Sequence, residues 1–177
     1  HALLAVALHA SYCGGKTLLS LRESAMKRID HIGVLGAGNT GFAAAAQLTH
    51  RGYKVTLAEL PAFADALDPI RSDGVIHLFG VGHQGPAKLH CVTDDVAVAL
   101  DNSNVLLLIV PAYGHAAWAR AIAPHIRPDH TLTLMPGTLG ALEVVKILRD
   151  ARAPAVSIAE TDTAPYVCRK TQPDGAT

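Results

Sequence analysis

The sequence predicts an α/β fold, a doubly wound parallel sheet with helices on both faces. Strand-like and helix-like segments alternate from residue 29 onward, which is the pattern of βα units around a parallel sheet. Residues 105–110 form a continuous apolar run, as expected of a central strand buried on both faces. A glycine-rich turn directly follows the first predicted strand. These three observations all favour an open parallel sheet.

Each element is assigned from its hydrophobic pattern and its flanking turn residues. The expected strands are residues 32–35, 54–59, 75–79, 88–92, 105–110, 131–135 and 155–159. The expected helices are residues 40–50, 61–71, 94–100, 113–126 and 139–151. The first helix is Ala-rich and ends before Gly52, the residue type preferred at a helix C-cap. Residues 80–86 form a turn-rich connector between two strands.

Composition excludes several classes of protein. The chain has 177 residues, with 15 basic and 15 acidic side chains, so it lacks the positive charge of a nucleic-acid or anionic-membrane binder. Half of the residues are hydrophobic and 17% are charged, which argues against disorder. The longest apolar run, residues 105–112, is far shorter than the roughly 18 residues of a membrane span.

The cysteines favour a reducing compartment. Cys13, Cys91 and Cys168 are odd in number and far apart, and no Cys/His pair has metal-ligand spacing. We therefore expect no disulfide framework, no metal site and a cytoplasmic protein.

The beginning of the chain reads as an addition to the domain. Residue 1 is His, and from the first methionine, Met26, the chain runs straight into the first predicted strand. We expect residues 1–25 to be an extension of doubtful origin and residues 26–177 to be one domain. The apolar segment 2–8 is too short for a signal peptide and has no basic segment before it. Residues 15–17 resemble the end of a phosphate-binding loop, but Ala10 stands where that motif needs glycine.

The most informative motif lies between the first strand and the first helix. It fits G-x-G-x-x-G and consists of Gly36, Ala37, Gly38, Asn39, Thr40 and Gly41. In a Rossmann-type dinucleotide site, Gly36 permits the tight turn, Gly38 admits the pyrophosphate and Gly41 allows close helix–strand packing. The phosphates are held by free N–H groups at the helix N-terminus. The alternative is an ordinary Gly-rich turn, and the strand–turn–helix context favours the dinucleotide site.

The end of the second strand bears on the choice of cofactor. Glu59 stands about 20 residues beyond the glycines, where an acid binds the ribose hydroxyls of the adenosine half. A carboxylate there repels the extra phosphate of NADP, so we expect NAD. NADP stays open as an alternative, because Arg71 could reach a phosphate. Glu59 could also be a solvated strand-end residue.

Three further loops follow the carboxyl ends of predicted strands, where ligands bind in open α/β sheets. The first contains Val110, Pro111, Ala112 and Tyr113, which we expect along the middle of the cofactor. The second contains Gly137, whose lack of a side chain lets the backbone approach the nicotinamide ribose. The third contains Glu160 and Thr161, near the nicotinamide end. Each loop could instead be a plain strand-end turn, but three such endings in a row favour a lined groove.

The histidines are not assigned to catalysis. His115 follows the central strand and could act as an acid–base group, but we expect it to cap the next helix or to face solvent. His77, His83 and His90 lie around the β connector, where surface positions are expected.

Several motifs together resemble one family. They are VLGAGNTG at residues 34–41, IRSDGVIHL at 70–78, VPAYGH at 110–115, MPGT at 135–138 and AETDTAPYVCR at 159–169. From Met26 on, the chain resembles the N-terminal NAD(P)-binding domain of the octopine/nopaline (opine) dehydrogenases. Ala164 and Val167 depart from the family pattern, which more often has Leu and Ala there.

The resemblance implies a specific activity. Opine dehydrogenases join the amine of an amino acid to a 2-oxo acid, using a reduced nicotinamide cofactor. In that family a second, helical domain follows and supplies the acid–base histidine, so the resemblance assigns no catalytic residue within this chain. It also implies that the chain is truncated before the substrate domain and is by itself inactive. The residues leave two alternatives open: a ketopantoate-reductase-like or glycerol-3-phosphate-dehydrogenase-like enzyme, and a non-catalytic nucleotide-binding module. The oligomeric state is not indicated.

Overall fold

A computed structural model describes residues 29–101 and 103–176, so the expected extension, residues 1–25, lies outside the described residues. A six-stranded sheet has the order β5-β2-β1-β6-β7-β8, with all neighbouring strands parallel. Its strands are β1 (His31–Leu35), β2 (Lys54–Ala58), β5 (Cys91–Thr93), β6 (Val105–Leu108), β7 (Thr131–Leu134) and β8 (Ser157–Glu160). The predicted fold class, a doubly wound parallel sheet, is confirmed.

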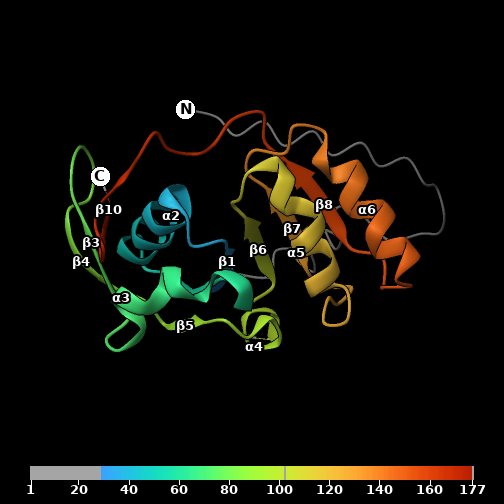
Figure 1. Ribbon diagram of the computed structural model, residues 1–177, viewed down its shortest axis with the longest axis horizontal. Coiled ribbons are helices and arrows are strands. Elements are labelled where there is room, and N and C mark those ends of the chain that lie inside the picture. The colour runs from blue at the N-terminus through green and yellow to red at the C-terminus, as the bar shows by residue number, and fades with distance from the viewer. Residues whose placement is uncertain (1–28, 102, 177) are drawn as a thin grey trace, which may run out of the picture.

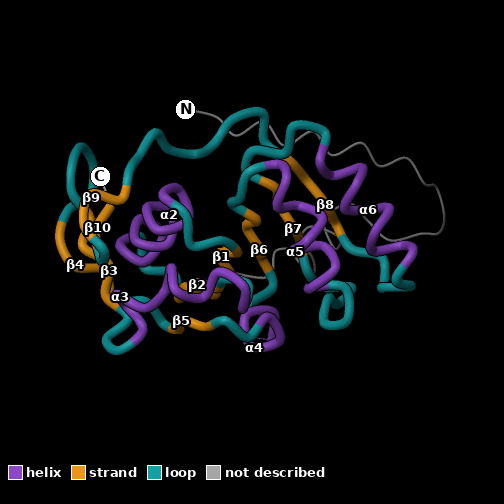
Figure 2. Tube along the Cα trace, viewed as in Figure 1, coloured by secondary structure: helices purple, strands orange, loops and turns teal. Residues whose placement is uncertain are grey.

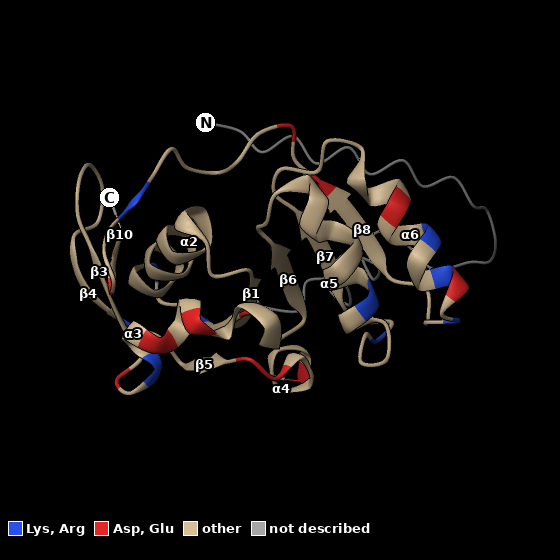
Figure 3. Ribbon diagram, in the orientation of Figure 1, with Lys and Arg blue, Asp and Glu red and all other residues tan. Residues whose placement is uncertain are grey.

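Helices cover both faces of this sheet (Figure 1). They are α2 (Asn39–His50), α3 (Asp68–Arg71), α4 (Val96–Asp101), α5 (His115–Ile122) and α6 (Gly140–Asp150), with 3₁₀ turns η1 (Pro61–Leu67) and η2 (Ala112–Gly114). One apolar core contains α2, and a second contains α4, α5 and α6. Charged residues of both signs are interspersed along α6 and around α3 (Figure 3).

The chain reverses its direction of travel across the sheet between β1 and β6. It moves outward from β1 to β2 and β5, then returns to β6 on the other side of β1. Such a reversal is a topological switch point, where the loops after two adjacent strands diverge and leave a crevice. The glycine motif and the loop after β6 lie at this point.

A second sheet, with the order β4-β3-β10-β9, packs against α2 (Figure 2). Its strands are β3 (Val75–Leu78), β4 (Gly85–Lys88), β9 (Lys170–Gln172) and β10 (Gly175–Ala176). Because α2 lies between the two sheets, the run from Ala43 to Ala46 is buried throughout. Small side chains are required where a helix packs closely on two sides, which accounts for the Ala-rich composition.

The segment 88–92 was expected to be one strand, and this is wrong. Lys88 ends β4, which pairs antiparallel with β3, and Cys91 begins β5, which pairs parallel with β2. Leu89 and His90 carry the chain between the sheets and donate backbone hydrogen bonds to Gly74 and Val55 respectively. Leu89 is buried and Val92 is partly buried in the same apolar core, so the apolar pattern gives no sign of the break between the two strands.

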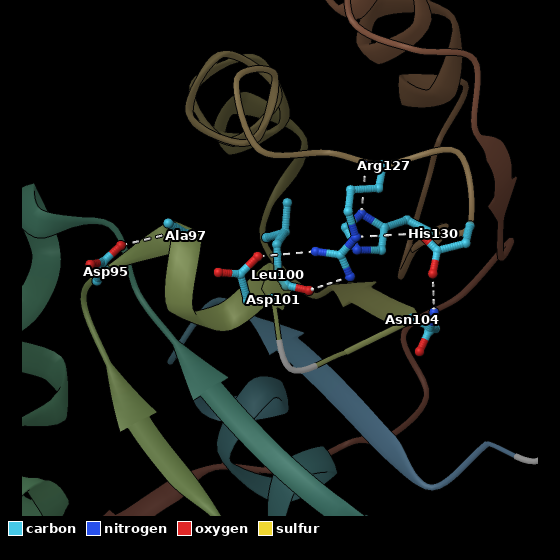
Figure 4. A network of polar contacts seen from close by, with 8 residues as sticks. Asp95, Ala97, Leu100, Asp101, Asn104, Arg127 and His130 are labelled. Atoms are coloured by element: carbon cyan, nitrogen blue, oxygen red, sulfur yellow. Dashed lines mark hydrogen bonds and ion pairs between the residues drawn. The ribbon is translucent and has the colours of Figure 1, made fainter.

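An ion-pair network joins the amino-terminal edge of β6 and β7, away from the glycine motif (Figure 4). The Arg127 guanidinium donates to Asp101 Oδ1 at 3.1 Å and to the Leu100 carbonyl at 3.3 Å. His130 Nδ1 accepts the Arg127 backbone N–H at 3.0 Å. This network ties the end of α4 to the turn before β7.

Candidate dinucleotide-binding site

The loops after β1, β2 and β6 surround a pocket of about 250 Å³. Its lining residues are Ala37, Gly38, Glu59, Leu60, Phe63, Ala66, Ile109, Val110, Pro111, Tyr113, Gly114, Ala117 and Trp118. Six of these were expected from the sequence to bind a cofactor. The pocket walls are mostly apolar, and their polar groups include the Glu59 carboxylate and the backbone of the glycine turn. This is the usual composition of a small-molecule site.

The glycine turn, residues 36–41, has the geometry expected from its three glycines. Gly36 has φ +110°, and a Cβ there would lie 2.6 Å from the Ile109 carbonyl oxygen. A Cβ at Gly41 would lie 1.8 Å from the Gly36 carbonyl oxygen. A Cβ at Gly38 would meet nothing within 4 Å. Gly36 and Gly41 are therefore needed for packing, whereas Gly38 borders open space.

The first turn of α2 faces this open space. Its N-cap residue is Gly38, which has no side chain to bind the first N–H groups of the helix. Those N–H groups have no partners within the helix and carry the positive end of its dipole. A helix N-terminus beside open space is a favourable site for a phosphate. The glycine turn and the first turn of α2 therefore fit the pyrophosphate of a dinucleotide.

Glu59 lies at the wall of the pocket and holds the glycine turn. The residue is only 7% exposed, so it is not a solvated strand-end residue. Oε2 accepts the Ala37 N–H at 2.7 Å, and Oε1 accepts the Leu60 N–H at 2.8 Å. Each carboxylate oxygen retains a second lone pair for a ribose hydroxyl. Arg71, the alternative phosphate contact, is engaged in ion pairs with Asp68 and Asp94.

The remaining expected residues form a separate cluster at the ends of β7 and β8. Glu160 Oε1 accepts the Leu139 N–H and Oε2 accepts the Ala141 N–H, each at 3.1 Å. The Gly137 N–H donates to the Thr161 carbonyl at 2.9 Å. Gly137, Glu160 and Thr161 are thus brought together, but they do not line the pocket beside Glu59. The Glu160 carboxylate stabilises the first turn of α6, a structural role that its position in the sequence did not indicate.

His115 neither caps α5 nor faces solvent, so that expectation is wrong. Its side chain is fully buried, and neither ring nitrogen has a hydrogen-bond partner among the described residues. A Cβ at Gly140 would lie 2.2 Å from His115 Nδ1, so the ring packs directly under the start of α6. His83 and His90 are exposed as expected, whereas His77 is half-buried.

The sequence did not reveal that the segment after β8 returns to the glycine turn (Figure 1). The backbone N–H of Lys170 donates to Asn39 Oδ1 at 2.8 Å, and Cys168 Sγ lies 3.8 Å from Thr40 Oγ1. The Lys170 ammonium donates to the carbonyl oxygens of Ala37, at 3.3 Å, and Ala66, at 3.4 Å. Burial lowers the pKa of Lys170, and the Glu59 carboxylate partly opposes this shift. A Pro-Asp-Gly turn at residues 173–175 is the one sequence signal of the hairpin that carries this segment.

Within residues 29–101 and 103–176, no group of three or more His, Cys, Asp or Glu side chains could hold a metal ion. No helix in the same ranges is long and apolar enough to cross a membrane.

The strand order, the switch point and the glycine turn define a Rossmann-type dinucleotide-binding domain. The chain belongs to the family of the NAD-dependent glycerol-3-phosphate dehydrogenase N-terminus, whose family model matches residues 31–140. NAD(H) is the cofactor of that family.

The similar proteins include opine dehydrogenases, which confirms the resemblance expected from the sequence. An opine dehydrogenase of Arthrobacter sp. (strain 1C) is 39% identical over 145 residues, which are 81% of this chain and 40% of that protein. A structure of octopine dehydrogenase with NADH and L-arginine matches with a TM-score of 0.69 and 22% identity, covering 82% of this chain and 38% of the other. A ketopantoate reductase from Ralstonia eutropha matches with a TM-score of 0.63 and 16% identity, covering 82% and 45%. The chain therefore spans about 40% of the length of the opine dehydrogenase that it matches.

Proposed function

We propose that this chain is the cofactor domain of an opine-type dehydrogenase, which uses NADH to condense an amino acid reductively with a 2-oxo acid. The 39% identity to an opine dehydrogenase over 81% of the chain carries this proposal. The glycine turn and the buried Glu59 carboxylate beside it support the cofactor assignment. NADH, when bound, supplies the hydride that reduces the imine formed from amine and ketone.

The proposed contacts divide the expected residues into four groups, and the first three bind the adenosine half and the middle of the cofactor. The glycine turn and the first turn of α2, from Gly36 to Gly41, hold the pyrophosphate. Glu59 accepts hydrogen bonds from the hydroxyls of the adenosine ribose, which favours NAD over NADP. The residues of the loop after β6 lie along the middle of the cofactor: Val110, Pro111, Ala112 and Tyr113.

The cluster of Gly137, Glu160 and Thr161 borders the nicotinamide end in this proposal. Glu160 acts there mainly through the backbone, because its carboxylate oxygens already bind Leu139 and Ala141. It fixes the loop between β7 and α6, against which the nicotinamide ribose rests.

We further propose that residues 26–177 form one folding unit that binds NADH without turnover. Hydride transfer requires a substrate held over the nicotinamide and water kept out. The residues described here form one wall around the cofactor, and the amino acid and 2-oxo acid need a second.

The test is NADH oxidation by the protein expressed from its complete gene. Oxidation that requires both an amino acid and a 2-oxo acid supports the proposal. Oxidation with the 2-oxo acid alone contradicts it and favours a ketopantoate-reductase-like enzyme. NADH binding without oxidation under any pair of substrates contradicts it in favour of a nucleotide-binding module.

A further inference from the structure

Lys170 makes three hydrogen bonds to the neighbourhood of the glycine turn, although it lies more than 100 residues away in the chain. Its backbone N–H binds the Asn39 side chain, which belongs to the turn. Its ammonium group binds the carbonyl oxygens of Ala37 and Ala66. The strand β9 therefore brings one cationic side chain to the glycine turn.

The ammonium group is also partly removed from water. It lies 3.3 Å from the centroid of the fully buried Phe42 ring, a close cation–π contact. A partly desolvated charge is costly unless its partners are well placed. Here two carbonyl oxygens, an aromatic face and the nearby Glu59 carboxylate provide that compensation.

Ala37 lies between two opposite charges. Its N–H donates to Glu59 Oε2 at 2.7 Å, and its carbonyl accepts from Lys170 Nζ at 3.3 Å. Both polar backbone groups of the residue between Gly36 and Gly38 are thus fixed by charged side chains. Charge-assisted hydrogen bonds are stronger and more directional than neutral ones, so this pair holds the turn in one conformation.

We propose that Lys170 is a positioning residue of the NAD site, which fixes the glycine turn through Ala37 and balances the charge of Glu59. The proposal rests on the proposed function of the turn as the pyrophosphate site. Lys170 acts through Ala37 and Glu59, so it sets how well the first N–H groups of α2 are preorganised for the phosphates. Preorganisation of this kind raises affinity without adding a contact to the ligand.

The experiment is an NADH titration of the full chain, followed by fluorescence, with Lys170→Met, Lys170→Arg and Lys146→Met. Lys146 is a matched control, because it is an exposed lysine on α6 that pairs with Asp150. We expect Lys170→Met to raise the Kd for NADH about tenfold, the effect of losing one charge-assisted hydrogen bond. Lys170→Arg should stay within about threefold of the wild type, and Lys146→Met should bind as the wild type does.

Three results would overturn the proposal while the wild type still binds NADH. These are an unchanged Kd in Lys170→Met, an equal loss in Lys170→Met and Lys170→Arg, and an equal loss in Lys146→Met. If Lys170→Met does not fold, as judged by circular dichroism, Lys170→Gln is held to the same criteria. Failure of the wild type to bind NADH instead contradicts the proposed function itself.

Discussion

The Glu59 carboxylate accepts a hydrogen bond of 2.7 Å from the backbone N–H of Ala37. The acid at the end of β2 therefore holds the glycine turn at the end of β1, in addition to any contact it makes with a ribose. Two adjacent parallel strands end in one hydrogen-bonded unit, and this unit borders the pocket beside the first turn of α2.

Replacing Glu59 should weaken NADH binding more than NADPH binding. Glu59→Ala removes the proposed acceptor of the ribose hydroxyls, and each hydrogen bond to a charged group contributes about 1.5–3 kcal/mol. NADPH loses less because the negative charge that repels its extra phosphate is also removed. Titrations of both nucleotides measure this difference. Equal Kd values for the variant and the wild type with both nucleotides would show that Glu59 is not at the ribose.

The contact between His115 and the start of α6 predicts a coupled pair of substitutions. Gly140→Ala should lower the free energy of unfolding by about 1–3 kcal/mol, because its Cβ would meet His115 Nδ1. In a His115→Ala background the same change should be neutral or stabilising, since alanine favours a helix over glycine by about 1 kcal/mol. Urea denaturation of the four proteins in this double-mutant cycle gives the coupling. The same cost in both backgrounds would contradict the packing.

His130 predicts a loss of stability in mild acid. Burial, followed by the nearby Arg127 charge, lowers the pKa of His130, and its Nδ1 accepts the Arg127 N–H. The unfolded chain therefore takes up a proton as the pH falls through about 6.5, while the folded chain does not. Stability should decline from pH 7 downward and level off below the pKa of the folded state.

The measurement is the free energy of unfolding between pH 5 and pH 8. His130→Asn should flatten the decline. His31, whose pKa is also lowered by burial and by His90 and Lys54, contributes to the same decline, so it should persist in part. A pH profile identical in His130→Asn and the wild type would contradict this assignment.

The sequence predicts the part of the site that depends on local chain geometry. The glycine turn is recognisable because Gly36 needs a positive φ and Gly41 must admit the Gly36 carbonyl, and both demands are local. The six-stranded sheet is predictable for a similar reason, because its strands are short apolar segments bounded by turns.

Contacts between distant segments could not be predicted in this way. Lys170 reaches Ala37 only because β9 and β10 extend the second sheet beside α2, and strands of three and two residues leave almost no pattern. The burial of His115 is equally remote in origin, since it depends on where α6 begins. The Glu160 carboxylate binds the start of α6 because of the path of the loop between β7 and α6. That path cannot be predicted from the residues of the loop.

The most direct test of the central claim is an NADH titration of Gly38→Ala beside a thermal melt. Gly38 has φ −74° and ψ −175°, which alanine adopts readily, and its Cβ would meet no protein atom within 4 Å. If the open space beside Gly38 receives the pyrophosphate, the variant should melt within a few degrees of the wild type and bind NADH at least about tenfold more weakly. A Gly38→Ala protein that is equally stable and binds NADH with unchanged affinity would contradict the claim that the nucleotide approaches the backbone here.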